Sequence, residues 1–206
     1  MKLFLAAEIK NPVAIEKLRQ FVGGFESKKI LYIPTAANGE AMGLWKAGGS
    51  YAMAQSLNAS LTVLELETTT EEQLIEELKD IDILWIAGGM SAYLLYWIRR
   101  RKLDVLLPEL LSRGVIYVGS SAGSMVCSKT QNVAEWFFGA PETGASLIPG
   151  LGLIDFAIYP HFEDALFSQI EKKWEKGSLY LLKNDEVITV VDGSVTVMGE
   201  TRIVTK

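Results

Sequence analysis

The stretch that most constrains the fold of this chain runs from Val115 to Ser128 and reads VIYVGSSAGSMVCS. Its first half is an apolar run typical of a buried strand, and its second half has the small residues typical of a helix start. The pentapeptide from Gly119 to Gly123 fits the pattern G-x-S-x-G, whose glycines let the backbone turn sharply from a strand into a helix. We therefore expect Ser121 at the tip of a tight turn.

This turn has two interpretations. In the first, the Ser121 hydroxyl is a nucleophile and the amide of Ala122 points to where an oxyanion would form. In the second, the turn belongs to ordinary α/β packing or binds a phosphate at a helix N-terminus. Short motifs also occur by chance, so the rest of the chain has to decide between them.

Length and charge narrow the class of protein. A chain of 206 residues with 49% hydrophobic and 22% charged residues fits one globular domain, which we expect to span residues 1–206. The formal charge of −5 and the pI near 5.1 argue against binding to nucleic acid, which requires a basic face.

The chain has one cysteine, Cys127, and one histidine, His161. This count excludes an internal disulfide and a Cys/His zinc site, and no metal or organic cofactor is implied. The first residues are too short an apolar run for a signal segment, and no run approaches the length of a membrane span. We therefore expect a cytoplasmic protein without a membrane segment.

Apolar strands alternate with helical patterns along the chain. This rhythm predicts an α/β fold of three layers, with a mostly parallel sheet and helices on both faces. The expected strands cover residues 3–7, 30–33, 61–66, 81–87, 115–119, 154–159, 180–182, 187–191 and 195–198. The expected helices cover residues 12–22, 45–57, 71–79, 91–98, 105–111 and 163–174.

Local signals mark several of these boundaries. Asn11 before Pro12 indicates a helix start, Thr70 with Gln73 forms a capping box, and Ser91 is expected to cap the helix that follows it. Gly48-Gly49 is expected to break the helix over 45–57, and Asp192-Gly193 predicts a C-terminal β-hairpin. Residues 129–150 show no period and are rich in Gly, Pro and Thr, which suggests a functional loop.

Ligands of a parallel sheet gather beyond the carboxyl ends of its strands. Gly88-Gly89, Ser121 and His161 all follow expected strands, so a parallel sheet would bring them to one rim. Any mechanism that needs an imidazole base must use His161, although a histidine satisfied by structural hydrogen bonds is the alternative.

Two known layouts fit poorly. In an α/β-hydrolase the acid and the histidine follow on later strands, whereas His161 comes only 40 residues after Ser121. A glutamine amidotransferase needs a thiolate at the turn, and Cys127 lies six residues further on, where a small core residue is expected.

Five segments together are more specific than the turn alone: ILYIPTAA, WIAGGMSAYLL, VIYVGSSAGSMV, YPHF and DEVITVVDGSVTVMG. In this order and spacing they resemble the serine dipeptidase family that includes dipeptidase E and, more distantly, cyanophycinase. The resemblance implies a class I glutamine amidotransferase-like fold with a flavodoxin-like core. It also implies a serine peptidase acting on short peptides, and it is consistent with a homodimer.

The resemblance implies roles for particular residues. Ser121 would be the nucleophile, His161 the base, and the amides of Gly89 and Ala122 the oxyanion hole. The family places an acid between the serine and the histidine, and Glu135 fits that place.

Asp155 is the alternative to Glu135 as triad acid, but it falls in the apolar run LIDFAIY, where a buried acid needs a dedicated partner. The chain departs from the family pattern at two further places, and the second concerns the substrate. The glycine loop lacks the family's Asn, and no arginine occurs between His161 and Trp174. Glu163 and Asp164 would repel an acidic substrate, so a strict preference for N-terminal Asp is not expected.

The sequence thus predicts a serine-type peptidase with a Ser-His-Glu triad that cleaves short peptides by acyl transfer. One alternative is a binding or regulatory protein that kept the scaffold and lost activity. Another is an esterase or amidase that uses the same residues on a non-peptide substrate.

Overall fold

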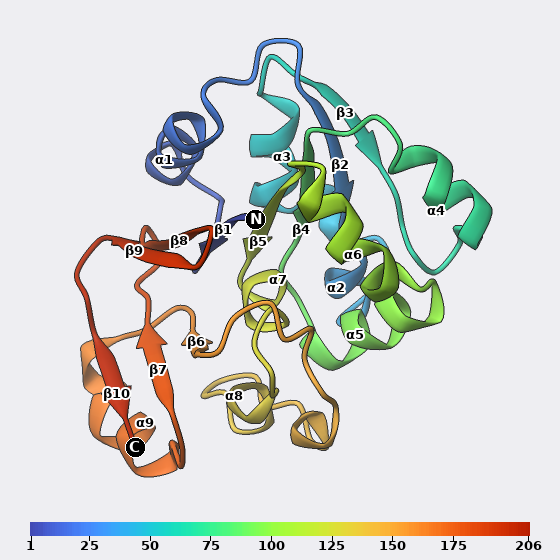
Figure 1. Cartoon of the computed structure of the whole chain (residues 1–206). Coiled ribbons are helices and arrows are strands. Elements are labelled where there is room, and N and C mark those ends of the chain that lie inside the picture. Colours follow the sequence, from blue (N-terminus) through green and yellow to red (C-terminus); the bar gives the residue numbers. More distant parts are fainter.

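The computed structural model describes all residues, Met1–Lys206, and is built on a seven-stranded sheet. Across this sheet the order is β3 (Ser60–Val63), β2 (Lys29–Ile33), β4 (Ile83–Ile86), β5 (Ile116–Ser120), β1 (Lys2–Ala6), β8 (Val187–Val191) and β9 (Ser194–Met198). The first five strands are parallel, and β8 and β9 continue the sheet as an antiparallel hairpin (Figure 1). The predicted mostly parallel sheet with a C-terminal hairpin is confirmed.

Helices cover both faces of this sheet. Successive side chains of a strand point to opposite faces, so Leu3 and Leu5 of β1 join one core and Phe4 and Ala6 join the other. The Leu3 face is covered by α4 (Glu71–Glu77), α5 (Ser91–Arg100) and α6 (Leu103–Ser112). The opposite face is covered by α1 (Pro12–Val22) and α3 (Gly49–Gln55). The three predicted layers are therefore present (Figure 1).

Most of the local signals in the sequence act as predicted. Asn11 caps α1 through its side chain, and Thr70 and Gln73 form both hydrogen bonds of the capping box of α4. Asp192 and Gly193 have φ angles of 47° and 86°, which is the backbone that a tight hairpin requires. Residues 45–57 are broken at Gly48, between η1 (Leu44–Ala47) and α3.

The prediction that Ser91 caps α5 is wrong. Met90 holds the N-cap position without a side-chain hydrogen bond, and Ser91 is the first helical residue. The free amides of this helix end are satisfied from a distant loop instead, because the Glu142 carboxylate accepts hydrogen bonds from the N–H groups of Ser91 at 2.8 Å and Ala92 at 2.7 Å. Caps supplied 50 residues away leave no local pattern in the sequence.

A second, three-stranded sheet has the order β10 (Ile203–Thr205), β7 (Ser178–Leu181) and β6 (Ala157–Tyr159). The strand before His161 was expected to join the main sheet, and this expectation is wrong because β6 pairs in parallel only with β7. The small sheet still shares a core with the main one, since Ile158 and Leu182 pack in the same cluster as Leu3. It carries η3 (Asp164–Leu166) and α9 (Phe167–Lys173) beside it (Figure 1).

Four short helices connect these parts: α2 (Thr35–Asn38), α7 (Ala122–Met125), α8 (Asn132–Glu135) and η2 (Ala145–Leu147). The last two lie within residues 129–150, which otherwise form the predicted long loop. None of the helices has both the length and the apolar character needed to span a membrane.

Candidate active site

Ser121 lies at the turn between β5 and α7, as the sequence predicts. Its φ of 51° and ψ of −112° are strained for a residue with a side chain. The turn can close this tightly only because of its glycines: a Cβ on Gly123 would lie 2.3 Å from the Ile86 carbonyl oxygen, and one on Gly119 would lie 2.6 Å from the Gly123 carbonyl oxygen. The sequence pattern therefore reflects a close approach of β4, β5 and α7.

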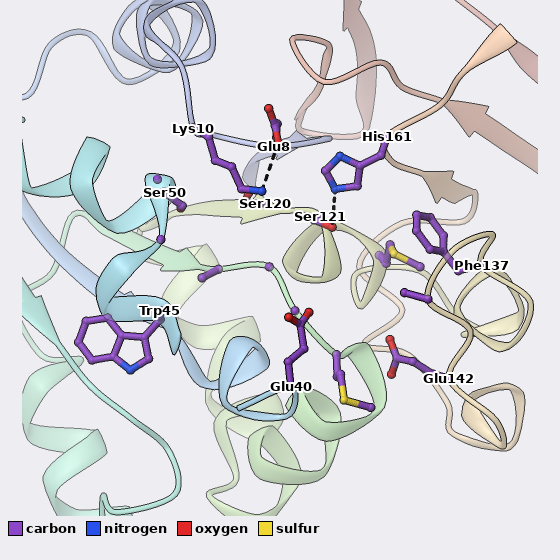
Figure 2. Close-up of a pocket in the computed structure, with 18 of the residues that line it drawn as sticks. Glu8, Lys10, Glu40, Trp45, Ser50, Ser120, Ser121, Phe137, Glu142 and His161 are labelled. Atoms are coloured by element: carbon purple, nitrogen blue, oxygen red, sulfur yellow. Dashed lines mark hydrogen bonds and ion pairs between the residues drawn. The ribbon is translucent and has the colours of Figure 1, made fainter. Parts of the chain in front are cut away.

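His161 reaches this serine from the small sheet. It follows β6 with a φ of 56°, and its Nε2 lies 3.0 Å from the Oγ of Ser121 (Figure 2). The two residues meet at the junction of two sheets and not along one rim, because Met125 of α7 packs in the same cluster as Ala157 and Tyr159 of β6. The structure thus brings together the predicted nucleophile and base by a route that the sequence did not indicate.

The other ring nitrogen of His161 faces Asn184. Nδ1 lies 2.7 Å from Oδ1 of Asn184, in the turn between β7 and β8. Because an amide oxygen can only accept, this contact assigns the proton to Nδ1 and leaves the lone pair of Nε2 facing the serine hydroxyl. That tautomer is the one a general base requires.

The predicted pairing of Glu135 with His161 is not found. Glu135 ends α8, and its partly exposed carboxylate accepts hydrogen bonds from both the N–H and the hydroxyl of Ser146, each at 3.0 Å. Hydrogen bonds from the backbone N–H groups of Ser146 and Gly144 and from the Ser146 hydroxyl hold the pKa of Glu135 below its ordinary value. Its carboxylate is thus engaged within its own loop.

Asp155 does not take that place either. It is exposed and makes no side-chain hydrogen bond or ion pair, while its neighbours Ile154 and Phe156 are buried in the core. The loop before it is held by aromatic stacking, with the rings of Trp136 and Phe137 at 5.9 and 4.8 Å from that of Tyr159. The structure therefore corrects both candidate acids and puts an amide at Nδ1.

Asn184 was missed although one signal pointed to it. Polar residues just beyond the carboxyl ends of strands singled out Ser121 and His161, and Asn184 follows β7 in the same way. Since β6 and β7 are parallel neighbours, the residues after both strands emerge at the same edge.

The turn that carries Asn184 is braced by a buried carboxylate. Glu186, only 6% exposed, accepts hydrogen bonds from the N–H groups of Lys183 and Glu200, each at 2.9 Å, and from the Arg202 guanidinium at 2.7 Å. Burial by itself raises the pKa of Glu186, but these hydrogen bonds outweigh it and hold the pKa below its ordinary value. The negative charge therefore persists at neutral pH and fixes both ends of the turn.

The Gly88-Gly89 segment lies against the serine. A Cβ on Gly88 would lie 3.0 Å from the Cβ of Ser121, and Gly89 has a φ of 137° and packs so closely on α2 that a Cβ would lie 2.3 Å from the Ala36 carbonyl oxygen. The backbone N–H groups of Gly89 and Ala122 donate no hydrogen bond within the protein. Two backbone donors thus remain available beside the Ser121 turn.

A cavity of about 490 Å³ opens in front of this pair. Its charged lining residues are Glu8, Lys10, Glu40 and Glu142, together with His161 (Figure 2). The carboxylates that follow His161 do not line it, and one of them, Asp164, pairs with Lys183 at 2.8 Å.

No group of three or more His, Cys, Asp or Glu side chains gathers in an arrangement that could hold a metal ion. Cys127 is fully buried, and its burial raises the pKa of the thiol to about 12, outweighing a hydrogen bond with Tyr117 that acts in the opposite direction. It packs in the core beneath the serine, as the sequence predicts.

Comparisons with known proteins identify the family of this chain. The chain is 28% identical over 203 residues to the uncharacterized peptidase Lin0382 of Listeria innocua, and the aligned region covers 94% of each chain. It is 25% identical over 194 residues to the uncharacterized peptidase Lmo0363 of Listeria monocytogenes, covering 91% of this chain and 93% of that one.

Solved structures share the fold. A crystal structure of a peptidase E candidate from Listeria monocytogenes matches with a TM-score of 0.80 at 21% identity, covering 97% of this chain and 98% of that one. A peptidase from an acI-B1 actinobacterium matches with a TM-score of 0.71 at 20% identity, over 99% and 93% of the two chains. The class I glutamine amidotransferase-like fold expected from the resemblance is therefore confirmed.

The model of peptidase family S51 matches residues 5–198, nearly the whole chain. This match spans the Ser121 turn, His161 and Asn184, and it confirms the resemblance to the dipeptidase E family. The chain therefore belongs to peptidase family S51.

Proposed function

We propose that this protein is a serine peptidase that hydrolyses short peptides, with Ser121 as the nucleophile and His161 as its general base. The observation that carries the proposal is the 3.0 Å contact between Ser121 Oγ and His161 Nε2, formed at a backbone turn that is strained at the serine. A strained turn that presents a hydroxyl to an imidazole has no evident structural use in this fold, whereas acyl transfer requires it.

The chemistry follows from the tautomer of His161. As Ser121 Oγ attacks the substrate carbonyl carbon, its proton passes to Nε2, and the same proton is then given to the departing amine when the C–N bond breaks. Water, activated by the same nitrogen, hydrolyses the acyl-enzyme and restores the serine. Asn184 acts as a positioning residue, because its amide oxygen at 2.7 Å orients the ring but carries no charge to offset the imidazolium.

The negative charge that develops on the substrate oxygen needs donors that are already in place. The amides of Gly89 and Ala122 suit this role, since both flank the nucleophile and neither is engaged elsewhere. Gly89 packs closely against α2, and this contact fixes the position of its amide. A larger residue at this position would have to move α2.

The cavity supports a small substrate. Its volume of about 490 Å³ is in the range of small-molecule sites, about 300–1,000 Å³, and Phe137 and Pro141 of the long loop form one wall. We also treat residues 1–206 as one domain, because the site needs residues from both sheets and the sheets share a core.

The test compares two adjacent serines. Ser121→Ala should abolish hydrolysis of a dipeptide panel and labelling by a serine-directed phosphonate, while both persist in Ser120→Ala. Ser120 is a matched control because its hydroxyl accepts the N–H of Ile9 at 3.2 Å and does not contact His161. Labelling that survives in Ser121→Ala, or an unlabelled wild-type protein, would contradict the proposal and favour a binding protein.

A further inference from the structure

The charges in the catalytic cavity are unbalanced. Three carboxylates and one ammonium line it, and the ammonium of Lys10 lies 3.4 Å from the carboxylate of Glu8 (Figure 2). The only cation of the cavity is thereby already paired. An acidic side chain that entered would find no free positive partner and two further carboxylates, Glu40 and Glu142.

A helix end beside the cavity, separate from the Ser121 turn, could also receive an anion, but the protein itself occupies it. The N-terminus of α5 opens toward the cavity, and helix N-termini bind anions through their free amides. Here the carboxylate of Glu142 accepts hydrogen bonds from the N–H groups of Ser91 and Ala92 at 2.8 and 2.7 Å. A substrate carboxylate therefore has to displace Glu142 to use this helix end.

Glu40 stands apart from the other two acids. Its exposed carboxylate makes no hydrogen bond and no ion pair, and it points toward the open centre of the cavity (Figure 2). The turn before it packs tightly on α5, since a Cβ on Gly39 would lie 2.9 Å from the Cβ of Tyr93. This contact holds an unpaired negative charge at the edge of the site.

We propose that Glu40 is a specificity-determining residue, and that the site selects peptides whose N-terminal residue is lysine or arginine over those whose N-terminal residue is acidic. This inference rests on the proposed function. A basic side chain offers Glu40 the partner that it lacks, while an acidic one is repelled by both Glu40 and Glu142.

The experiment measures binding without turnover. Isothermal titration calorimetry on the Ser121→Ala protein, at low ionic strength, compares the dipeptides Lys-Leu, Leu-Leu and Asp-Leu. We expect Lys-Leu to bind about tenfold more tightly than Asp-Leu, with Leu-Leu between them. Adding Glu40→Gln should weaken the affinity for Lys-Leu by about fivefold and change the affinity for Leu-Leu by less than about twofold. Adding Glu142→Gln should strengthen Asp-Leu.

Glu26→Gln is the matched control, because Glu26 is an exposed glutamate in the turn between α1 and β2 and does not line the cavity. It should leave all three affinities unchanged. Each of three results would overturn the inference. Asp-Leu could bind as tightly as Lys-Leu, Lys-Leu could show no detectable binding, or the affinity for Lys-Leu could be unchanged by Glu40→Gln. Tight, Glu40-dependent binding of Lys-Leu without hydrolysis by the wild-type protein would instead refute the proposed function and leave the specificity intact.

Discussion

Asn184→Asp isolates what an amide does at the place where a carboxylate was expected. The substitution exchanges one amide group for a carboxylate of the same shape, 2.7 Å from Nδ1 of His161. Both partners accept the Nδ1 proton, so the tautomer and the 3.0 Å contact with Ser121 are retained. The added negative charge favours the imidazolium over the neutral ring.

The size of the effect follows from the distance and the exposure. Unit charges about 4 Å apart interact by about 1 kcal/mol in water and about 4 kcal/mol at an effective dielectric constant near 20. The contact between His161 and Asn184 is exposed to solvent, so we expect the new carboxylate to stabilise the imidazolium by about 1–2 kcal/mol. Since one pH unit corresponds to 1.36 kcal/mol, the acidic limb of kcat/KM should move up by about one unit. Above that limb kcat should rise about tenfold, because the imidazolium forms in the transition state.

The assay is the pH profile of dipeptide hydrolysis for the wild-type protein, Asn184→Asp and Asn184→Ala. Asn184→Ala removes the acceptor and should lower kcat by about tenfold with little change in KM, the loss of about one hydrogen bond. Glu135→Gln is the control, and its profile should match that of the wild-type protein. An unshifted limb in Asn184→Asp together with full activity in Asn184→Ala would refute the positioning role, and a large loss in Glu135→Gln would restore that residue to the triad.

Two further predictions concern stability and reactivity. Glu186→Gln should lower the free energy of unfolding at pH 7 by about 2 kcal/mol in urea titrations, the scale of hydrogen bonds to a charged group. Because the folded-state pKa of Glu186 is lowered, its contribution is complete above the ordinary value of 4.5 and is lost as pH falls through the lowered value, so a difference that persists in strong acid would contradict the argument. Cys127 should resist iodoacetamide at pH 8 in the native protein and react after unfolding, because its thiol is buried and has a pKa of about 12; rapid native labelling, followed by mass spectrometry, would show that the core beneath Ser121 opens.

Features that depend on neighbouring residues are predictable from the amino-acid sequence. The cap at Asn11, the capping box of Thr70 and Gln73 and the hairpin at Asp192-Gly193 each join residues only a few positions apart. The strands and helices of the main sheet follow from apolar periodicity, since burying one face requires that period. These elements account for the three-layer architecture.

The errors fall where distant segments meet. Ser91 carries the right residue type for a cap, but it is the first helical residue, and Glu142 accepts hydrogen bonds from the N–H groups of Ser91 and Ala92 from 51 and 50 residues away. The sequence does not indicate that β6, β7 and β10 form a separate sheet, because the apolar pattern of a strand does not specify which strand it pairs with.

In the candidate site, too, local features are predictable from the sequence and contacts between distant segments are not. The glycines of residues 119–123 dictate the turn at Ser121, and a single histidine leaves one choice of base, so both could be named from the amino acids alone. Which group meets Nδ1 depends on how the β7–β8 turn, braced by Glu186 and Arg202, lies against β6. That contact joins His161 to Asn184 across 23 residues, and only the packed structure decides whether an amide or a carboxylate lies there.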